Sequence, residues 1–457
     1  MNAKIIKERI GLNRDQSPQG IASHQTMGEN MNISKKMRKL FAAFAAVAVA
    51  LTGSVFLAPI SKAADVSLTM YSWRVEDKAF YEDVIKDYTA ANPGVKITYQ
   101  SFPSADYQTI LMSAMAAGKG PDIVHVRAYG ALDQLVVPGY LSPLAANEIK
   151  GLSKYPKDAL DSQRGFSDKR LFGIPFAYQS LGIFYNLDYM RKAGINLPPK
   201  TYPEFVAQLK KIKDAGLQPL ANGGSTHMEQ MWGTIAPMFY GGTDYYNDVV
   251  AGKKTFNDPA FVKSLEAVQE LFPYMPANAT AVNYDASRAL FFSGKAAFFL
   301  GGIFELGYFR AQNPKLKFDF MATPPMTAGS KQFVSTWADG GYGINAKTSN
   351  RAESLKFINY LASKSYGQRF TEKIAQISAV PGVVIKDRQL NKAVSSINKG
   401  GTPYIMLVGF RYKNPTGSAL LQTGLPNMLN GTKTAKQVAD EVTKGVATWF
   451  APFAGKI

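Results

Sequence analysis

Apolar residues between 66 and 126 repeat with two different periods. Val66, Leu68 and Met70 are spaced two apart, as on one face of a strand. Phe80 and Val84 are spaced four apart, which is typical of a helix face. The stretch predicts, in order, a strand at 66–70, a helix at 80–88, a strand at 95–99, a helix at 107–117 and a buried strand at 123–126. This order predicts a mostly parallel sheet with helices on its faces.

Four later helices have a start signal in the sequence. Each signal places Ser, Thr, Asp or Asn just before an apolar stripe, where the side chain can accept a hydrogen bond from a free backbone N–H. The signals are Thr201 with Glu204, Asp258 with Pro259, Asn350 with Glu353, and Thr434 with Gln437. No internal repeat and no low-complexity linker separates these segments, so we expect the domains to be joined by short crossings.

The length of 457 residues suits two or three domains, preceded by a leader. Residues 32–39 are basic, residues 40–60 are apolar, and small residues follow at 61 and 63. This pattern predicts a secretory signal peptide at 31–64, cleaved after Ala63 or Ala64. An uncleaved membrane anchor is the alternative for the same long apolar run. Translation is expected to start at Met31, with residues 1–30 a non-native upstream extension.

Charge and cysteine content exclude several functions. Residues 1–64 supply +6 of the net charge of +18. The remaining basic surface could attract nucleic acid or anionic polymers. The mature part has no nucleic-acid motif and no more than two Lys or Arg in a row, so we expect a solvated surface and no nucleic-acid partner. With no cysteine and three histidines, one of them in the leader, we expect no disulfide, thioether lipid, metal site or cofactor.

Several short segments resemble one known family when they are taken in order. They read Gly-Lys-Gly-Pro-Asp-Ile-Val at 118–124, Leu-Phe-Gly-Ile-Pro at 171–175, Ile-Phe-Tyr-Asn-Leu-Asp at 183–188, Phe-Ser-Gly-Lys-Ala-Ala at 292–297 and Gly-Gly-Tyr-Gly-Ile-Asn-Ala-Lys at 340–347. With the stretch at 193–204, they make the chain similar to the family 1 extracellular solute-binding proteins of ABC importers, the group that includes maltose-binding protein. Many cell-surface members carry a lipid-modified cysteine, which this chain lacks.

The resemblance implies an α/β protein with the two-lobed, type II periplasmic-binding-protein fold. Each lobe would be a mostly parallel sheet flanked by helices, with the ligand in the cleft between the lobes. We expect the N-terminal lobe at 65–177 plus 340–390 and the C-terminal lobe at 178–339 plus 391–457. The chain would cross near 175–180, return near Gly340 and cross again near Asn391. The implied protein is a monomer, exported to the cell envelope or extracellular face of a bacterium.

Sugar recognition needs aromatic rings that pack on pyranose faces and planar polar groups that bind hydroxyls. The ends of the first and third strands place Trp73, Arg74 and Arg127 toward the expected cleft. Trp73 could instead cover its own sheet. The remaining ligand-binding candidates are Tyr178, Trp232, Phe304, Glu305, Trp337, Asp339 and Arg411. Tyr129, Gln179 and Tyr412 lie close to them in sequence.

Several candidates also have a structural explanation. Tyr178 and Gln179 could form a hinge, and Trp232 could be a core residue in a Met-rich helix. The arginines could pair with the carboxylates of an acidic sugar or with Asp339, Glu305 and Glu229.

The expected function is capture of a carbohydrate, an oligosaccharide that could be acidic, by hinge closure and delivery to an ABC permease. The alternatives are an exported glycoside hydrolase that uses two carboxylates and a basic surface adhesin for anionic polymers. No Gly-x-Ser-x-Gly motif, phosphate-binding loop or metal-ligand spacing supports another enzyme class, so no catalytic residue is predicted.

Overall fold

The computed structural model describes residues 65–196 and 198–456. The expected signal peptide, its cleavage site and the upstream extension lie outside the described residues. Within them, no helix combines the length and the apolar character needed to cross a membrane.

Ten strands within the described residues form a continuous set of pairings. The strands are β1 (Val66–Ser72), β2 (Val95–Ser101), β3 (Ile123–Arg127), β4 (Leu141–Ser142), β5 (Ile174–Asn186), β6 (Phe298–Gly302), β7 (Phe318–Met321), β8 (Val334–Asn345), β9 (Ile377–Ser378) and β10 (Gly401–Pro403). The main path runs in the order β2-β1-β3-β8-β5-β6. The strand β1 pairs in parallel with both β2 and β3, as the β-α-β-α-β pattern predicts.

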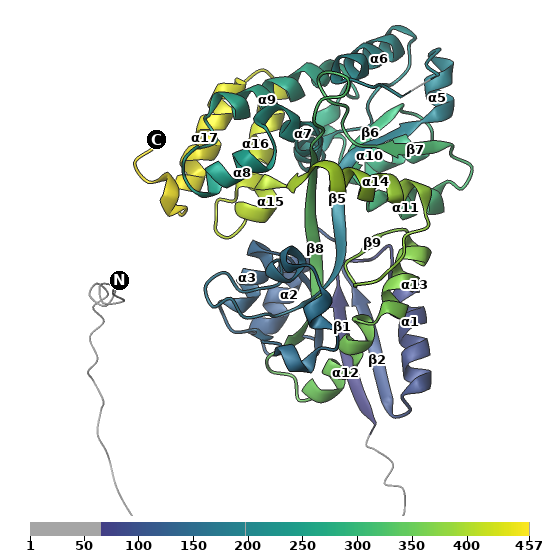
Figure 1. Cartoon of the computed structure of the whole chain (residues 1–457), viewed down its shortest axis with the longest axis vertical. Helices are drawn as coiled ribbons and strands as arrows, with labels where there is room; N and C mark the ends of the chain where they lie inside the picture. The colour runs from purple at the N-terminus through teal and green to yellow at the C-terminus, as the bar shows by residue number, and fades with distance from the viewer. Residues whose placement is uncertain (1–64, 197, 457) are drawn as a thin grey trace, which may run out of the picture. The chain divides into compact units, whose positions relative to one another are not determined.

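Two long strands, β5 and β8, run through both halves of the folded part (Figure 1). Side chains of Ile174 and Phe176 on β5 belong to one apolar core, whereas those of Leu181 and Ile183 belong to another. The two strands pair with each other in antiparallel fashion, and β5 also pairs antiparallel with β6 and β7. The antiparallel pairs that β5 makes with β6 and β7 depart from the mostly parallel sheet expected in the second half.

The first core lies between the β1–β3 sheet and a set of helices. Its largest buried rings include Tyr81, Tyr107 and Phe172. The helices beside it are α1 (Lys78–Ala91), α2 (Tyr107–Ala116), α3 (Gly130–Val136), α4 (Lys157–Asp161), α12 (Arg351–Leu361) and α13 (Lys364–Ile374).

Two further cores lie on opposite faces of the β5–β6–β7 sheet. Ile183 and Leu300 point into one of them, and Phe184 and Phe299 into the other, as the alternation of side chains along a strand requires. The first face is covered by α5 (Leu187–Lys192), α6 (Tyr202–Asp214), α7 (Gly224–Tyr240), α8 (Thr243–Val250), α9 (Pro259–Leu271), α15 (Ile405–Gly409), α16 (Gly417–Leu429) and α17 (Ala435–Ala447). The second face is covered by α10 (Tyr284–Phe292), α11 (Glu305–Gln312) and α14 (Arg388–Gly400).

Three of the four helix-start signals make the expected cap. The side chains of Thr201, Asp258 and Thr434 each accept a hydrogen bond from a backbone N–H of the helix that follows. Asn350 does not cap α12, because its amide instead donates to the carboxylate of Asp122 at 3.3 Å. The residue limits of the two expected lobes remain a prediction.

Candidate functional site

The strands β1 and β3 are parallel, so the residues at their carboxyl ends lie at the same edge of the sheet. Trp73 and Arg74 follow β1, and Arg127 is the last residue of β3. Trp73 is only 6% exposed, and its ring stacks on His125 at 4.3 Å between centroids. The guanidinium of Arg127 covers the same indole, 4.7 Å from its centroid. Trp73 thus supports Arg127 and covers the end of its own sheet.

Arg74 lies beneath this edge in a dense ion-pair network. Its Nε donates to Oδ2 of Asp77 at 2.7 Å, and its Nη2 lies 3.8 Å from Oε1 of Glu76. Burial is the largest single influence and acts to lower the pKa of Arg74. The nearby carboxylates of Asp77, Glu76 and Asp339 together hold the pKa of Arg74 well above its ordinary value. Arg74 is therefore a fixed positive charge with a carboxylate already bound.

Arg127 is held differently, through neutral oxygens. Its Nη2 donates to the backbone carbonyl of Ser104 at 2.8 Å and to the Ser104 hydroxyl at 3.0 Å. Burial lowers the pKa of Arg127, Asp339 acts to raise it, and the positive charges of Arg411 and Arg74 lower it further. Among the described residues, Arg127 forms no ion pair within 4.0 Å.

Asp339 lies where β8 crosses between the cores, and a β-bulge sets its position. Ala177 pairs with Gly340 and Tyr178 with Ala338, which leaves Asp339 as the extra residue of β8. Such a bulge re-aims the side chain of the extra residue. The carboxylate of Asp339 accepts hydrogen bonds from Trp337 Nε1 at 3.2 Å and Gln179 Nε2 at 3.3 Å.

Gln179 connects this carboxylate to another buried amide. It lies on β5 and is fully buried, and its Nε2 also donates to Oε1 of Gln376 at 3.1 Å. Its own Oε1 has no hydrogen-bond partner within the described part of the chain. A buried acceptor without a partner is costly, so this oxygen could accept a hydrogen bond from a ligand.

Glu305 forms a second ion-pair network on the other side of the crossing strands. It is the first residue of α11 and is 2% exposed. Its Oε1 accepts a hydrogen bond from the Tyr284 hydroxyl at 2.6 Å, and its Oε2 lies 3.0 Å from Nε of Arg288. Burial raises the pKa of Glu305, while Arg288 and Tyr284 oppose that rise. The Arg288 guanidinium in turn covers the Tyr308 ring at 3.5 Å.

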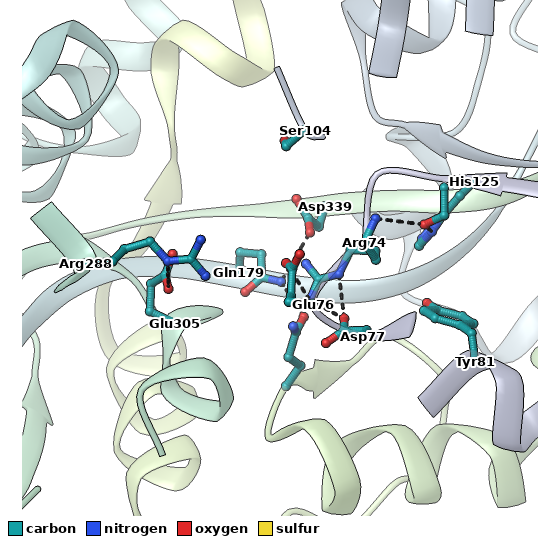
Figure 2. A network of polar contacts seen from close by, with 12 residues as sticks. Arg74, Glu76, Asp77, Tyr81, Ser104, His125, Gln179, Arg288, Glu305 and Asp339 are labelled. Atoms are coloured by element: carbon teal, nitrogen blue, oxygen red, sulfur yellow. Dashed lines mark hydrogen bonds and ion pairs between the residues drawn. The ribbon is translucent and has the colours of Figure 1, made fainter. Parts of the chain in front are cut away.

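Glu76 links the two networks electrostatically. It follows β1 and is the more exposed partner of Arg74, yet its charge acts on both Arg288 and Glu305. Figure 2 shows Glu76 next to Arg74 and Gln179, with Arg288 and Glu305 on one side and Asp77 on the other. We call the set of side chains that meets here the polar cluster. It consists of Arg74, Glu76, Arg127, Gln179, Arg288, Glu305 and Asp339.

Aromatic rings lie beside the polar cluster at the start of β8. The Trp337 ring contacts Phe304 at 6.4 Å and Tyr404 at 5.5 Å between centroids. Gly302 is needed here, because a Cβ at that position would lie 1.9 Å from the Phe304 ring. The Phe304 and Trp337 rings thus lie next to each other, close to the carboxylate of Asp339.

Arg411 and Tyr412 contact the first half of the molecule. A Cβ on Gly130, the first residue of α3, would lie 2.2 Å from the backbone oxygen of Arg411. The Tyr412 ring lies 4.7 Å from that of Phe166. The Arg411 Nη2 is 3.7 Å from Oε1 of the buried Glu229, so this arginine already has a carboxylate partner.

Two candidates lie away from the polar cluster. Trp232 is fully buried inside α7, where its indole N–H donates to the Ser264 hydroxyl at 3.0 Å. Its position agrees with the core explanation.

The Tyr178 hydroxyl donates to Asp158 at 2.8 Å, and Tyr129 accepts from the Ala338 N–H through its hydroxyl at 3.2 Å. Both tyrosines thus tie the first half to the crossing strands.

Sequence reasoning missed several members of this site. Glu76 and Asp77 lie in the polar loop directly after β1, so their nearness to Trp73 could have indicated them. Arg288 and Tyr284 lie on α10, just before the segment 292–297 and not within it, and Gln376 follows α13. Only the folded chain brings these three residues to β5 and β8.

Among residues 65–196 and 198–456, no three His, Cys, Asp or Glu side chains lie together as a metal site would require.

The fold and the site together define the class of protein. Two groups of α/β elements, joined by shared strands with a polar cluster at the crossing, form the type II periplasmic-binding-protein fold, as expected from the sequence. Residues 71–368 match the family of bacterial extracellular solute-binding proteins. The chain belongs to this family, which confirms the resemblance found in its motifs.

Individual relatives are distant but extend over most of the chain. An uncharacterised ABC transporter extracellular-binding protein of Pyrococcus horikoshii is 27% identical over 306 residues, 65% of this chain and 68% of that protein. The lactose-binding protein of Rhizobium radiobacter is 24% identical over 341 residues, 72% of this chain and 78% of that protein. A solved chitin oligosaccharide binding protein has a TM-score of 0.73 at 20% identity, over 85% of this chain and 99% of the other. At this identity the structural likeness concerns the fold alone.

Proposed function

We propose that this chain captures a carbohydrate outside the cytoplasm and delivers it to an ABC importer. The observation that carries the proposal is the polar cluster at the crossing of β5 and β8, flanked by Trp337 and Phe304. Planar polar groups next to aromatic rings are what hydroxyl-rich sugar rings require. Family membership and a relative named for lactose binding support a sugar as the solute.

More specifically, we propose that the carbohydrate is an oligosaccharide. Potential sugar contacts extend from Glu305 and Arg288 through Gln179 and Asp339 to Arg127, so more than one ring could be held. The structural relative named for chitin oligosaccharide binding supports the same extent of ligand.

The ligand could carry a carboxylate, and Arg127 is the side chain that favours this version. Arg74, Arg288 and Arg411 each lie within ion-pair distance of a carboxylate. Arg127 instead contacts the oxygens of Ser104. A carboxylate of a uronic acid would give this half-buried guanidinium a charged partner.

Capture works by closure of the two halves about β5 and β8 in this proposal. Arg74 and Arg127 extend from the first half, whereas Arg288, Glu305 and Trp337 extend from the second. A ligand that contacts both sets favours the closed arrangement, because only there are all contacts made. The closed protein is then the form that docks on the permease.

A glycoside hydrolase would use two carboxylates here, one of them as a proton donor. Glu305 and Glu229 lie instead within ion-pair distance of Arg288 and Arg411. The relatives described above are named as binding proteins. We therefore favour binding without turnover.

A thermal-shift screen of the purified protein against neutral and uronic-acid oligosaccharides tests the proposal. A sugar at about 100 times its dissociation constant should add about 2.7 kcal/mol to the free energy of unfolding. Chromatography of the same mixtures should show the sugar uncleaved. No shift with any sugar would contradict the proposal, and cleaved product would favour the hydrolase. Salt-sensitive binding of anionic polysaccharides without linkage preference, in a protein that no short sugar stabilises, would favour the adhesin.

A further inference from the structure

Two neighbouring cavities in the second half are lined by cationic side chains. The larger, of about 750 Å³, has Lys200, Lys386, Arg388 and Lys392 in its lining. The other, of about 540 Å³, has Arg310 and Lys317. Neither lining contains an Asp or Glu side chain. Six positive charges without a carboxylate among them favour an anionic ligand.

The two cavities share three segments of the chain. Tyr185 at the end of β5 lines one cavity, and Leu187 two residues later lines the other. In the same way, Phe320 and Phe318 on β7 line different cavities, as do Arg388 and Gln389 on α14. Residues two apart in a strand are separated by about 7 Å, so the cavities adjoin along β7.

Carboxylates behind the cavities neutralise only part of this charge. Asp319 lies 2.8 Å from Arg388 and 2.6 Å from Lys392, and Asp387 lies 2.7 Å from Arg310. Both acids are largely covered. Glu204, near Lys200, accepts a hydrogen bond from the Lys200 backbone N–H at 2.7 Å. In the described part of the chain, the ammonium groups of Lys200, Lys317 and Lys386 have no ion-pair partner within 4.0 Å.

We propose that the two cavities together bind an extended polyanion with closely spaced phosphate groups. The site lies on β7 and α14, and none of its cationic residues belongs to the polar cluster. A linear polymer can place charges in both cavities at once, which raises its affinity above that of a single phosphate. This inference does not depend on the proposed sugar, because the two sites share no side chain.

Titration of the purified protein with inorganic polyphosphate tests the site, with inorganic monophosphate for comparison. We expect polyphosphate to bind at least about a hundredfold more tightly than monophosphate. Its affinity should fall roughly tenfold or more as salt rises from about 50 to about 200 mM, because bound phosphates release counterions. Equal affinity for the two probes, or no binding of polyphosphate at low salt, would overturn the proposal.

A pair of triple variants separates the site from the net charge of the protein. The test variant is Lys200→Gln with Lys317→Gln and Lys386→Gln. The control is Lys86→Gln with Lys119→Gln and Lys154→Gln, which changes three exposed lysines of the first half. The test variant should lose at least about tenfold in polyphosphate affinity, and the control less than about threefold. Equal losses of polyphosphate affinity in the two triple variants would show that the net charge of the protein, and not the pair of cavities, binds the polymer. This result would overturn the proposed site.

Discussion

Arg127 rests on Trp73, with its guanidinium 4.7 Å from the centroid of the indole ring. The indole itself is held between this cation and the ring of His125. The indole for which the sequence left two roles open, sugar contact or cover of its own sheet, therefore supports an arginine. At this edge of the sheet, the polar group available to a ligand is the guanidinium of Arg127 and not the indole of Trp73.

Replacement of Arg127 by Gln should weaken sugar binding with little effect on folding. Hydrogen bonds from a charged donor contribute roughly 1.5–3 kcal/mol, so the affinity should fall about tenfold or more. Calorimetric titration with the sugar found in the screen measures the change. Arg191→Gln alters an exposed arginine that pairs with Asp188, and it should leave the affinity unchanged. Equal affinities of Arg127→Gln and the unmodified protein would remove Arg127 from the site.

Trp337 and Trp232 offer a matched comparison of two buried indoles. The N–H of Trp337 donates to Asp339 in the polar cluster, whereas that of Trp232 donates to Ser264 in the core. Both Trp→Phe variants should lower the melting temperature. Only Trp337→Phe should also weaken sugar binding, by about 1–3 kcal/mol if the residue is a central anchor. A similar loss of affinity in Trp232→Phe would contradict the site described above.

The first five elements of the first half could be predicted because each of them has a local signal. The period of two at 66–70 and the helix spacing at 80–88 coincide with β1 and α1. Asn350 shows the limit of such signals. Its sequence context predicts a cap, yet its side-chain amide donates a hydrogen bond to Asp122, 228 residues away. A contact between distant residues cannot be derived from a local pattern.

The polar cluster was only partly predictable for the same reason. Arg74, Arg127 and Asp339 lie at strand ends or next to glycines, where a sequence motif draws attention. Arg288 lies within α10, just before the segment 292–297, and nothing in that segment indicates its partner. Its role follows from the pairing with Glu305, which depends on how α10 and α11 pack.

The ion pair between Glu148 and Arg351 should make stability depend on acid pH. It joins residues 203 apart in sequence, with Oε1 and Nη1 at 2.6 Å. The hydrogen bond from Arg351 holds the pKa of Glu148 below its ordinary value. A carboxylate with a lowered folded-state pKa contributes stability above its unfolded-state pKa, about 4.3, and loses it as the pH falls through the folded-state value.

Urea unfolding of Glu148→Gln at several pH values measures this contribution. The variant should be less stable than the unmodified protein by about 1 kcal/mol at pH 7, since Arg351 is partly exposed and solvent screens the pair. The difference should vanish near pH 2. Glu82→Gln removes a solvent-exposed pair with Lys78 and should change stability by less than about 0.5 kcal/mol. A difference that persists unchanged at low pH would contradict the assignment.

Gly340 allows β8 to pass close to the first core. A Cβ there would lie 2.4 Å from the backbone oxygen of Val126 and 2.9 Å from the Trp73 ring. Gly340→Ala should therefore destabilise the fold by about 1–3 kcal/mol and weaken sugar binding through displacement of Trp73 and Arg127. Gly409→Ala is the control, because its nearest contact would be an ordinary 3.5 Å. Stability and affinity that both remain unchanged in Gly340→Ala would show that the close approach is unimportant.

Asp339 tests the central claim most directly, since it joins the aromatic and polar parts of the site at the crossing of β5 and β8. Calorimetric titration with the sugar identified in the screen should compare Asp339→Asn with Asp244→Asn, which alters an exposed carboxylate on α8. We predict at least about a tenfold loss of affinity for Asp339→Asn and none for Asp244→Asn. Unchanged affinity in Asp339→Asn would contradict a sugar site at the polar cluster.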